Sequence, residues 1–227
     1  MLLTQMAQSQ ACLGEFSVGA TNGEAAFSIA KRLGRDFDIG LASYGIGMVH
    51  LYAGDLGPSV AVLERGLRAV ETGQPAQSIF AILGGLLSYA YLRASAEDAA
   101  LALCRRVLAY DEESRHHANW TRLYGAVILR ETRQEGEALV LARRASQIAR
   151  RWGYAVQTVQ SDLLLAQLLQ EDNPPRARYH LKKATRLSEM IDMRSCLVRC
   201  LIESGPLYRG QNQNRRAEEC GSIRMIV

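Results

Sequence analysis

The sequence lacks the short motifs with which most enzymes bind phosphate or activate a nucleophile. It has only three lysines, and no Gly-x-x-x-x-Gly-Lys-Ser/Thr segment that could form a phosphate-binding loop. A Gly-x-Ser-x-Gly nucleophile elbow is absent as well. Phenylalanine and proline are scarce, at four and five residues, while Ala, Leu and Arg are abundant, and this balance favours helix over sheet. The sequence therefore predicts a helical protein that is not an enzyme and needs no cofactor.

Long apolar runs and an export signal are also missing. The longest apolar run, Phe80 to Leu92, is shorter than the ~20 residues of a membrane span and contains Gly84, Gly85 and Ser88. The first residues carry no basic leader of the secretory kind. Without export, cysteines are expected to be reduced thiols that pack as small core residues. We therefore expect a cytoplasmic protein that makes no membrane contact. The five cysteines are Cys12, Cys104, Cys196, Cys200 and Cys220.

The net charge of +4 is unevenly distributed along the chain. Residues 1–100 carry a net charge of −3, and residues 101–227 carry +7. A basic half can attract nucleic acid or an acidic protein. Solvated helix faces give the same charge balance and are its commoner origin. We therefore expect no nucleic-acid partner.

One segment has the pattern of two helices joined by a short turn. Residues 36–53 carry apolar side chains at helical spacing, and so do residues 58–72. Gly54 and Asp55 lie between them and break the first helix, and Gly73 follows the second as a C-terminal cap. The segment predicts a helix–turn–helix unit.

The same pattern recurs every 39–40 residues. A small residue stands one turn into each predicted second helix, and these equivalent positions form one column of the repeat. Two further columns follow four and seven residues later. Antiparallel helices approach closely where one presents Gly, Ala or Ser against a larger residue of its partner. Such a period is the sequence signature of a solenoid. The first column is Gly19, Ser59, Ala99, Ala138, Ala177 and Ala217, and the third is Ala26, Gly66, Arg106, Ala145, Ala184 and Arg224.

The repeat predicts the fold class. A single helix hairpin cannot bury its apolar face alone, so several hairpins must stack to form a core. We predict an all-α protein, a right-handed superhelix of stacked antiparallel helix pairs with about eleven or twelve helices and essentially no strand. The whole chain, residues 1–227, forms one array. Its predicted units are residues 1–35, 36–75, 76–115, 116–154 and 155–194, followed by an incomplete unit at 195–227.

The inter-helix turn completes a pattern that is typical of one repeat family. The turn reads GEF at residues 14–16 and GDL at residues 54–56. With the small residues of both helices, it resembles the tetratricopeptide (TPR) repeat, although the unit is longer than the ~34 residues of a standard TPR. The phrases GIGMVHLYAGDLGPSVAVLERG (45–66) and LGGLLSYAYL (83–92) are similar to long-unit arrays. Such arrays occur in bacterial maltose-regulon-type activators and at the C-termini of multidomain ATPase and nucleotide-cyclase proteins.

The resemblance implies a partner-binding surface rather than a catalytic site. In such superhelices the first helix of each pair lines the concave side, where partners dock. Tyrosine offers a large contact area with a polar tip, and arginine can pair with a carboxylate. The candidate groove residues, which match the groove-lining positions of the family, are Tyr44, Met48, Tyr52, Ser88, Tyr91, Val127 and Arg130. The alternative is that some of these side chains pack between neighbouring units.

Two pairs of residues could suggest a metal site. His116 and His117 lie near three acidic residues, but adjacent histidines point in different directions on a helix. Cys196 and Cys200 are one turn apart, yet a second pair of soft ligands is missing. Loop and core positions explain both pairs better, so we expect no metal.

Two functions remain open at this point. The first is a non-catalytic protein–protein interaction scaffold for a protein or peptide partner, as the regulatory or partner-sensing part of a larger bacterial signalling protein. The second is the array of a transcriptional activator that senses a ligand or an inhibitor protein. The first helix lacks a polar cap, and residues 195–227 stop before a second helix can finish. Because solenoids need polar terminal caps for solubility, we expect frayed ends, self-association through the uncapped ends, or a neighbouring domain.

Overall fold

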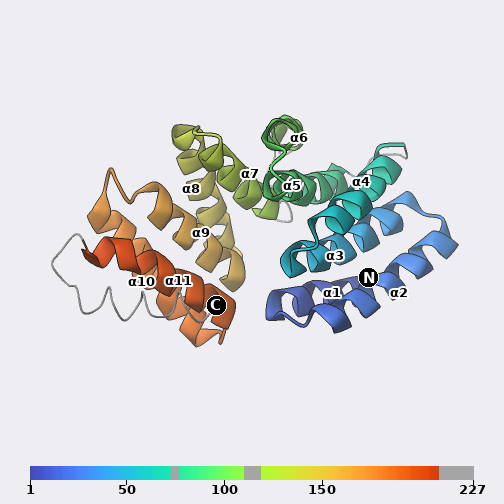
Figure 1. Ribbon diagram of the computed structural model, residues 1–227, viewed down its shortest axis with the longest axis horizontal. Coiled ribbons are helices and arrows are strands. Elements are labelled where there is room, and N and C mark those ends of the chain that lie inside the picture. Colours follow the sequence, from blue (N-terminus) through green and yellow to red (C-terminus); the bar gives the residue numbers. More distant parts are fainter. Residues whose placement is uncertain (73–76, 110–118, 210–227) are drawn as a thin grey trace. The chain divides into compact units, whose positions relative to one another are not determined.

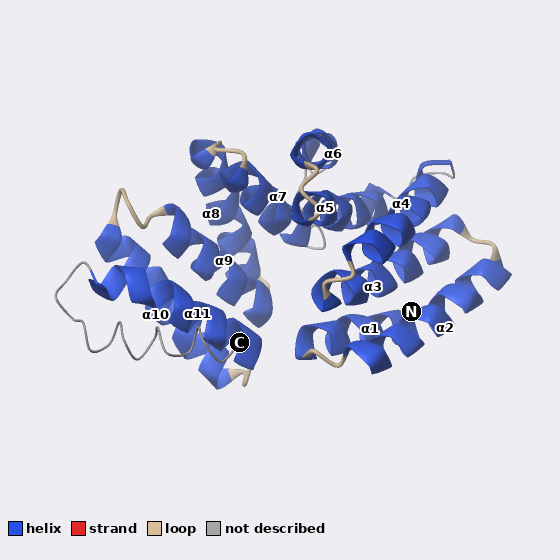
Figure 2. Cartoon of the chain, in the orientation of Figure 1, coloured by secondary structure: helices blue, strands red, loops and turns tan. Residues whose placement is uncertain are grey.

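The computed structural model describes residues 1–72, 77–109 and 119–209. Within these ranges the chain forms eleven α-helices and no strand (Figure 1, Figure 2). This confirms the all-α class that the sequence predicts. The helices are α1 (Leu2–Leu13), α2 (Phe16–Leu33), α3 (Asp36–Ala53), α4 (Leu56–Thr72), α5 (Gln77–Arg93), α6 (Glu97–Ala109), α7 (Asn119–Glu131), α8 (Glu135–Arg151), α9 (Ala155–Leu168), α10 (Pro174–Met190) and α11 (Arg194–Arg209).

The chain divides into two compact units, residues 1–133 and 134–227. Unit 1 contains α1 to α7, and the described part of unit 2 contains α8 to α11. None of the helices in the described ranges is both long enough and apolar enough to cross a membrane. The division of the array into six repeat units stays a prediction.

Some of the sequence predictions concern residues outside the described ranges. These are the helix cap at Gly73, the pair His116 and His117, and residues 210–227 of the incomplete last unit. The side chain of Cys196 also lies outside the part of the chain that the structure describes.

The helices of unit 1 form pairs that stack in a row. Helix α1 packs on α2, α3 on α4, and α5 on α6, and each second helix also packs on the first helix of the next pair. The first helices α1, α3, α5 and α7 follow one another in contact (Figure 1). One cluster of buried apolar side chains joins residues of α1, α3, α4, α5, α6 and α7. Successive pairs therefore share one core, as a solenoid requires.

Glycine ends the first helix in each of the first two pairs. Gly14 and Gly54 adopt the left-handed conformation, with φ of 82° and 91°, which residues with a side chain rarely adopt. The N–H of Asp55 then donates to the carbonyl of His50 at 2.9 Å, which closes the cap. The turn predicted from the repeated sequence is confirmed at both positions.

The turn of the third pair is one residue longer and shifts the register of α6. Two residues separate α3 from α4, whereas three separate α5 from α6, and one of these, Ser95, has a positive φ of 61°. As a result, Ala100 and Val107 are fully buried. Ala99 and Arg106, which the sequence columns place at the helix contact, are exposed. The alignment of the small-residue columns is therefore wrong by one residue in α6. It assumes that all turns have the same length, whereas the extra turn residue moves α6 by one position along the sequence.

Small residues bring α3 and α4 close together. A Cβ atom placed on Gly47 would lie 2.5 Å from Cδ2 of Leu63. One placed on Gly66 would lie 2.4 Å from Cβ of Ser43. The hydroxyl of Ser59 adds a buried hydrogen bond to the carbonyl of Gly47, at 2.9 Å. The two helices therefore meet at glycine and serine, as close helix packing demands.

In unit 2, helices α8 to α11 pack in chain order around a second core. Helix α10 begins at Pro174, because proline is tolerated in the first turn of a helix. The side chain of Asn173 caps this helix by accepting the N–H of Arg176 at 3.2 Å. Cys200 is fully buried in the same core.

A buried carboxylate links three helices of unit 2. Asp162 on α9 has a side chain only 2% exposed, and its two oxygens accept from Nη2 of Arg150 on α8 at 2.6 and 2.8 Å. The Nδ1 atom of His180 on α10 lies 2.8 Å from Oδ1 of Asp162. Burying a charge is costly unless it is paired and hydrogen-bonded. The cluster therefore favours one arrangement of α8, α9 and α10.

The structure describes the side chains of three of the five cysteines, and all three are in the thiol form. Cys104 and Cys200 are buried, as expected for small core residues, and Cys12 is half-buried. Burial raises the pKa of the Cys104 thiol to about 11. The raised pKa keeps this thiol protonated at neutral pH, and the protonated form is a poor nucleophile.

We expect Cys104 to be almost unreactive while the protein is folded. In a variant that keeps Cys104 and replaces the other cysteines by alanine, labelling by a thiol reagent at pH 8 should be at least ~100-fold slower than in guanidinium. A matched variant that keeps only Cys12 should react faster in the folded state. A Cys104 rate close to that of the unfolded chain would contradict the packing of α6.

Candidate functional site

Aromatic side chains gather along the first helices of unit 1. On α3, three large side chains follow at four-residue spacing and so share one face of the helix. Helix α7 has two aromatic residues at the same spacing, and α5 contributes one more. We call this surface the aromatic face. It consists of Tyr44, Met48 and Tyr52 of α3, Tyr89 of α5, and Trp120 and Tyr124 of α7.

Stacked rings connect α5 and α7. The ring centroids of Tyr89 and Tyr124 are 5.1 Å apart with an interplanar angle of 16°. Those of Trp120 and Tyr124 are 5.7 Å apart with an angle of 23°. Such pairs contribute about 0.5–1.5 kcal/mol beyond the burial of their area. The stack therefore holds the three rings in a fixed arrangement.

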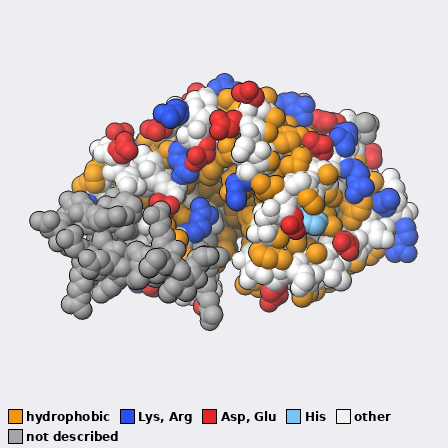
Figure 3. Space-filling model, viewed as in Figure 1, with side chains coloured by type: hydrophobic (Ala, Val, Ile, Leu, Met, Phe, Trp, Pro, Cys, Tyr) orange, Lys and Arg blue, Asp and Glu red, His pale blue; other side chains and the backbone are white. Residues whose placement is uncertain are grey.

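The centre of the aromatic face is buried, and its outer residues are accessible. Tyr44 and Tyr124 are each 5% exposed, and burial is the main cause that raises the pKa of both phenols well above the usual value. The neighbouring Tyr52 adds to both shifts. Tyr52 itself is 36% exposed, while Tyr89 and Trp120 are half-buried. Figure 3 shows hydrophobic side chains reaching the surface of unit 1 in several places. The accessible rings of the aromatic face are thus neutral and amphipathic.

Three other predicted groove residues have different surroundings. Val127, three residues beyond the stacked tyrosine of α7, is half-buried. Arg130 is half-buried, and its Nε donates to Oε1 of Glu131 at 3.0 Å. Ser88 is fully buried, and its hydroxyl donates to the carbonyl of Gly84 in the same helix at 2.7 Å. Ser88 therefore directs its proton into its own helix rather than toward a partner.

Sequence reasoning missed Tyr89, Trp120 and Tyr124. The spacing of Trp120, Tyr124 and Val127, at four and three residues, was a usable signal, because it places all three on one side of a helix. No comparable signal exists for Tyr89. Its ring joins the others only because α5 and α7 pack against each other.

Tyr91, which was also predicted for the groove, lies on the other side of α5. Two residues after Tyr89, it points about 200° away around the helix axis. Its hydroxyl donates to Oε1 of Glu64 on α4 at 2.7 Å. Burial, followed by the hydrogen bond to Glu64 and the charge of that carboxylate, raises the pKa of Tyr91 to about 12. Tyr91 therefore belongs to a different site.

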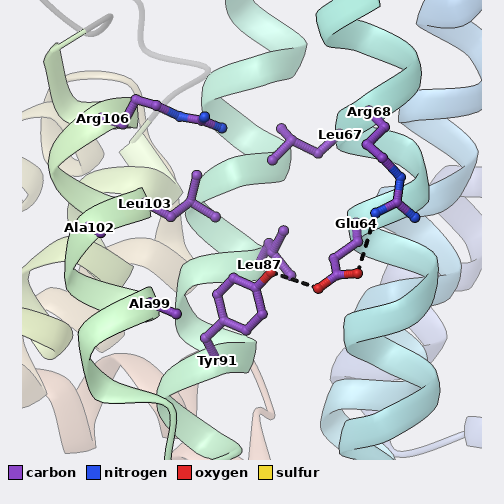
Figure 4. Close-up of a pocket in the computed structure, with 9 residues that line it drawn as sticks. All are labelled: Glu64, Leu67, Arg68, Leu87, Tyr91, Ala99, Ala102, Leu103 and Arg106. Carbon is purple, nitrogen blue, oxygen red and sulfur yellow. Dashed lines mark hydrogen bonds and ion pairs between the residues drawn. The ribbon is translucent and has the colours of Figure 1, made fainter.

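That site is a pocket of about 410 Å³ between α4, α5 and α6 (Figure 4). Three buried leucines line it, Leu67 of α4, Leu87 of α5 and Leu103 of α6. On α6 the wall also includes Ala99 and Ala102, whose short side chains leave space between α4 and α6. The pocket is therefore apolar inside.

Charged side chains surround this apolar interior. The carboxylate of Glu64 lies 3.5 Å from Nη1 of Arg68, one turn further along α4. Arg106 of α6 reaches across to Oε1 of Glu71 at 2.6 Å, and its guanidinium lies 5.3 Å from the centre of the Phe80 ring. Ligand pockets of about 300–1,000 Å³ commonly combine an apolar lining with a few placed polar groups. This pocket has that composition.

Within the described ranges, no three His, Cys, Asp or Glu side chains come together as potential ligands for a metal ion.

Known proteins share the fold of this chain rather than its sequence. No protein-family model matches it, and neither does any curated protein. The solved structure of BtubC (BKLC) from P. vanneervenii is similar, with a TM-score of 0.69 and 16% identity over 91% of this chain and 90% of that chain. RapI in its apo form has a TM-score of 0.60 and 15% identity, over 99% of this chain and 65% of that chain. Kinesin light chain TPR-like repeats from Podosopora anserina have a TM-score of 0.56 and 16% identity over 82% and 92%.

These similarities define the class of protein. At 15–16% identity they show the fold alone, and that fold is a TPR-like array of helix pairs. Such a fold is consistent with a protein-interaction scaffold. The chain spans slightly less than two thirds of RapI. The resemblance to ATPase, cyclase and activator arrays stays a prediction, as do the signalling role and the cytoplasmic location.

Proposed function

We propose that this chain is a non-catalytic scaffold whose aromatic face binds a segment of a partner protein. The observation that carries the proposal is the joining of aromatic rings from α3, α5 and α7 into one surface. Tyrosine and tryptophan are enriched among the residues that dominate binding energy at protein interfaces. Solenoids present such residues from successive repeats along an extended surface.

The burial pattern supports binding without a large rearrangement. Tyr44 and Tyr124 are fixed in the core, so they can support the accessible rings of Tyr52, Tyr89 and Trp120. A surface that is already ordered loses less conformational entropy when a partner binds. The partner in this proposal is a peptide or helix of another protein, and the scaffold is the partner-sensing part of a larger bacterial signalling protein in the cytoplasm.

The test is a hot-spot substitution at the accessible part of the aromatic face. Binding segments are first selected from a displayed peptide library against the full chain, and their affinity is measured by calorimetry. We expect Tyr52→Ala and Trp120→Ala each to weaken binding by at least ~30-fold, as for an interface hot spot of about 2 kcal/mol. The matched control is Tyr179→Ala, because Tyr179 is 56% exposed on α10 of unit 2. Selected segments that bind both variants as tightly as the wild type would refute the proposal.

A second candidate function rests on the pocket between α4, α5 and α6. Its volume of about 410 Å³ suits a small ligand, which fits the alternative of a ligand-sensing array. Replacing Ala102 by leucine should fill the pocket without touching the aromatic face. A small ligand that raises the melting temperature of the wild type, but not of Ala102→Leu, would favour this candidate over the first.

A further inference from the structure

The outer side of α10, in unit 2, carries an excess of positive charge. The helix has five basic residues and one acidic residue. Its buried residues include Ala177, Leu181 and Ala184, which belong to the core of unit 2. At about 3.6 residues per turn, the opposite side of the helix holds basic residues together with two large apolar ones. We call this opposite side the basic face, and it consists of Arg176, Tyr179, Lys182, Lys183, Arg186 and Met190.

The folding of α10 does not explain these charges. In the comparable helices α4 and α6, two basic residues balance two acidic ones, and Arg106 of α6 pairs with Glu71 of α4. Among the residues that the structure describes, no ion pair involves a basic side chain of the basic face. Lys182 and Arg186 stand four residues apart, where like charges repel. Arg176 lies in the first turn, where a positive charge opposes the helix dipole.

Large apolar side chains are exposed among the charges. Tyr179 and Met190 are 56% and 72% exposed. The ammonium group of Lys183 lies 5.0 Å from the centre of the Tyr179 ring and donates to its hydroxyl at 3.3 Å, which holds the ring at the surface. Tyrosine is enriched where proteins meet the headgroup layer of a membrane. Basic and apolar side chains on one side of a helix are typical of helices that lie on anionic lipids.

Helix α8 presents the same combination of side chains. The carboxylate of Asp162 contacts both Arg150 of α8 and His180 of α10, so the two helices lie next to each other at this point. The outer side of α8, opposite its buried alanines, holds the exposed Arg151 and also Val140, which is 67% exposed. Two neighbouring helices of unit 2 thus carry exposed basic and apolar residues.

We propose that the basic face, together with the outer side of α8, binds the surface of a membrane that contains anionic lipids. The lipid headgroups supply negative charge, and the boundary between headgroups and acyl chains accepts Tyr179 and Met190. An acidic protein segment or a nucleic acid would neutralise the charges but would offer no apolar layer to Met190. Such binding needs no membrane span, so the lack of long apolar runs does not argue against it. The site lies in unit 2 and does not depend on the aromatic face of unit 1.

Co-sedimentation of the full chain with lipid vesicles tests the charged part of the proposal. We expect binding to phosphatidylcholine vesicles with about 30% phosphatidylserine at about 0.1 M salt, and at least ~10-fold weaker binding without phosphatidylserine. Lys182→Gln combined with Arg186→Gln should lower the partition coefficient by about 20-fold, since each basic residue near such a surface contributes about fivefold. The matched control is Lys31→Gln combined with Arg32→Gln, which removes the same charge from exposed residues of α2 and should change binding by less than ~2-fold.

Tryptophan fluorescence tests the apolar part. Tyr179→Trp, in a background of Trp120→Phe and Trp152→Phe, should emit at shorter wavelength with the anionic vesicles, because its indole leaves water for the lipid interface. Soluble poly-glutamate and single-stranded RNA should cause no such shift. A wild type that stays in solution with the anionic vesicles overturns the proposal. An equal loss of binding in both double variants overturns it as well, and so does tighter binding to a soluble polyanion than to the vesicles. None of these measurements involves peptide binding at the aromatic face.

Discussion

Replacing Gly66 by alanine is expected to lower the free energy of unfolding of unit 1 by about 3 kcal/mol, the upper end of the usual cost of overpacking. The new Cβ atom would lie 2.4 Å from Cβ of Ser43 and 2.7 Å from its hydroxyl oxygen. Both Cβ atoms are bonded directly to backbone, so neither can turn away, and α3 and α4 must move apart. The loss exceeds the ~1 kcal/mol that alanine gains over glycine in a helix interior.

Two further variants give this prediction its controls. Gly57→Ala changes the same helix where a Cβ atom would meet nothing within 4 Å, so it should leave stability unchanged or raise it by up to ~1 kcal/mol. Ser43→Gly combined with Gly66→Ala should recover at least half of the loss, because it removes the opposing Cβ. Denaturation can be followed by the fluorescence of Trp120 in a Trp152→Phe background. Equal stability of wild type and Gly66→Ala would show that α3 and α4 are not in such close contact.

The second large effect is expected in unit 2, at the buried carboxylate of Asp162. Arg150→Ala should cost about 2 kcal/mol, because it leaves this carboxylate with His180 as its neighbour in a buried site. The figure is below that for a fully buried ion pair because the Arg150 side chain is 40% exposed. Unfolding of unit 2 can be followed by Trp152 in a Trp120→Phe background.

The neighbouring residue supplies a matched control for this prediction. Arg151 is an exposed residue of the same last turn of α8, so Arg151→Ala should change stability by no more than ~0.5 kcal/mol. If the Arg150 and Arg151 variants have the same stability, then water rather than Arg150 balances the charge of Asp162.

Most of the fold could be predicted from the sequence because local signals agree with it. Glycine at 14 and 54 is needed for a left-handed cap, and apolar spacing gives the flanking helices. Small residues such as Gly66 indicate where helices meet. The register of α6 could not be predicted in this way, because the positive φ of Ser95 and the extra turn residue leave no mark on the spacing of apolar residues.

The candidate site was predictable only in part. Tyr44 and Tyr52 fall on a face that the repeat pattern identifies, and the structure places them beside Tyr124. Tyr91 was predicted for that groove because the repeat pattern indicates that it lies on a first helix. The pattern indicates less reliably in which direction a side chain points. Asp162 and its partners were not singled out, because they come from three helices, and only the packed structure shows that they meet.

Helix α5 contributes to both candidate surfaces, with Tyr89 stacked in the aromatic face and Tyr91 lining the pocket beside α4. One rigid element is thus a wall of both candidate surfaces. If a partner at the aromatic face shifts or rotates α5, the shape of the pocket changes with it, and the two binding equilibria become coupled. Thermodynamic linkage then makes the effect reciprocal, so that a ligand in the pocket changes partner affinity by the same factor as the partner changes ligand affinity.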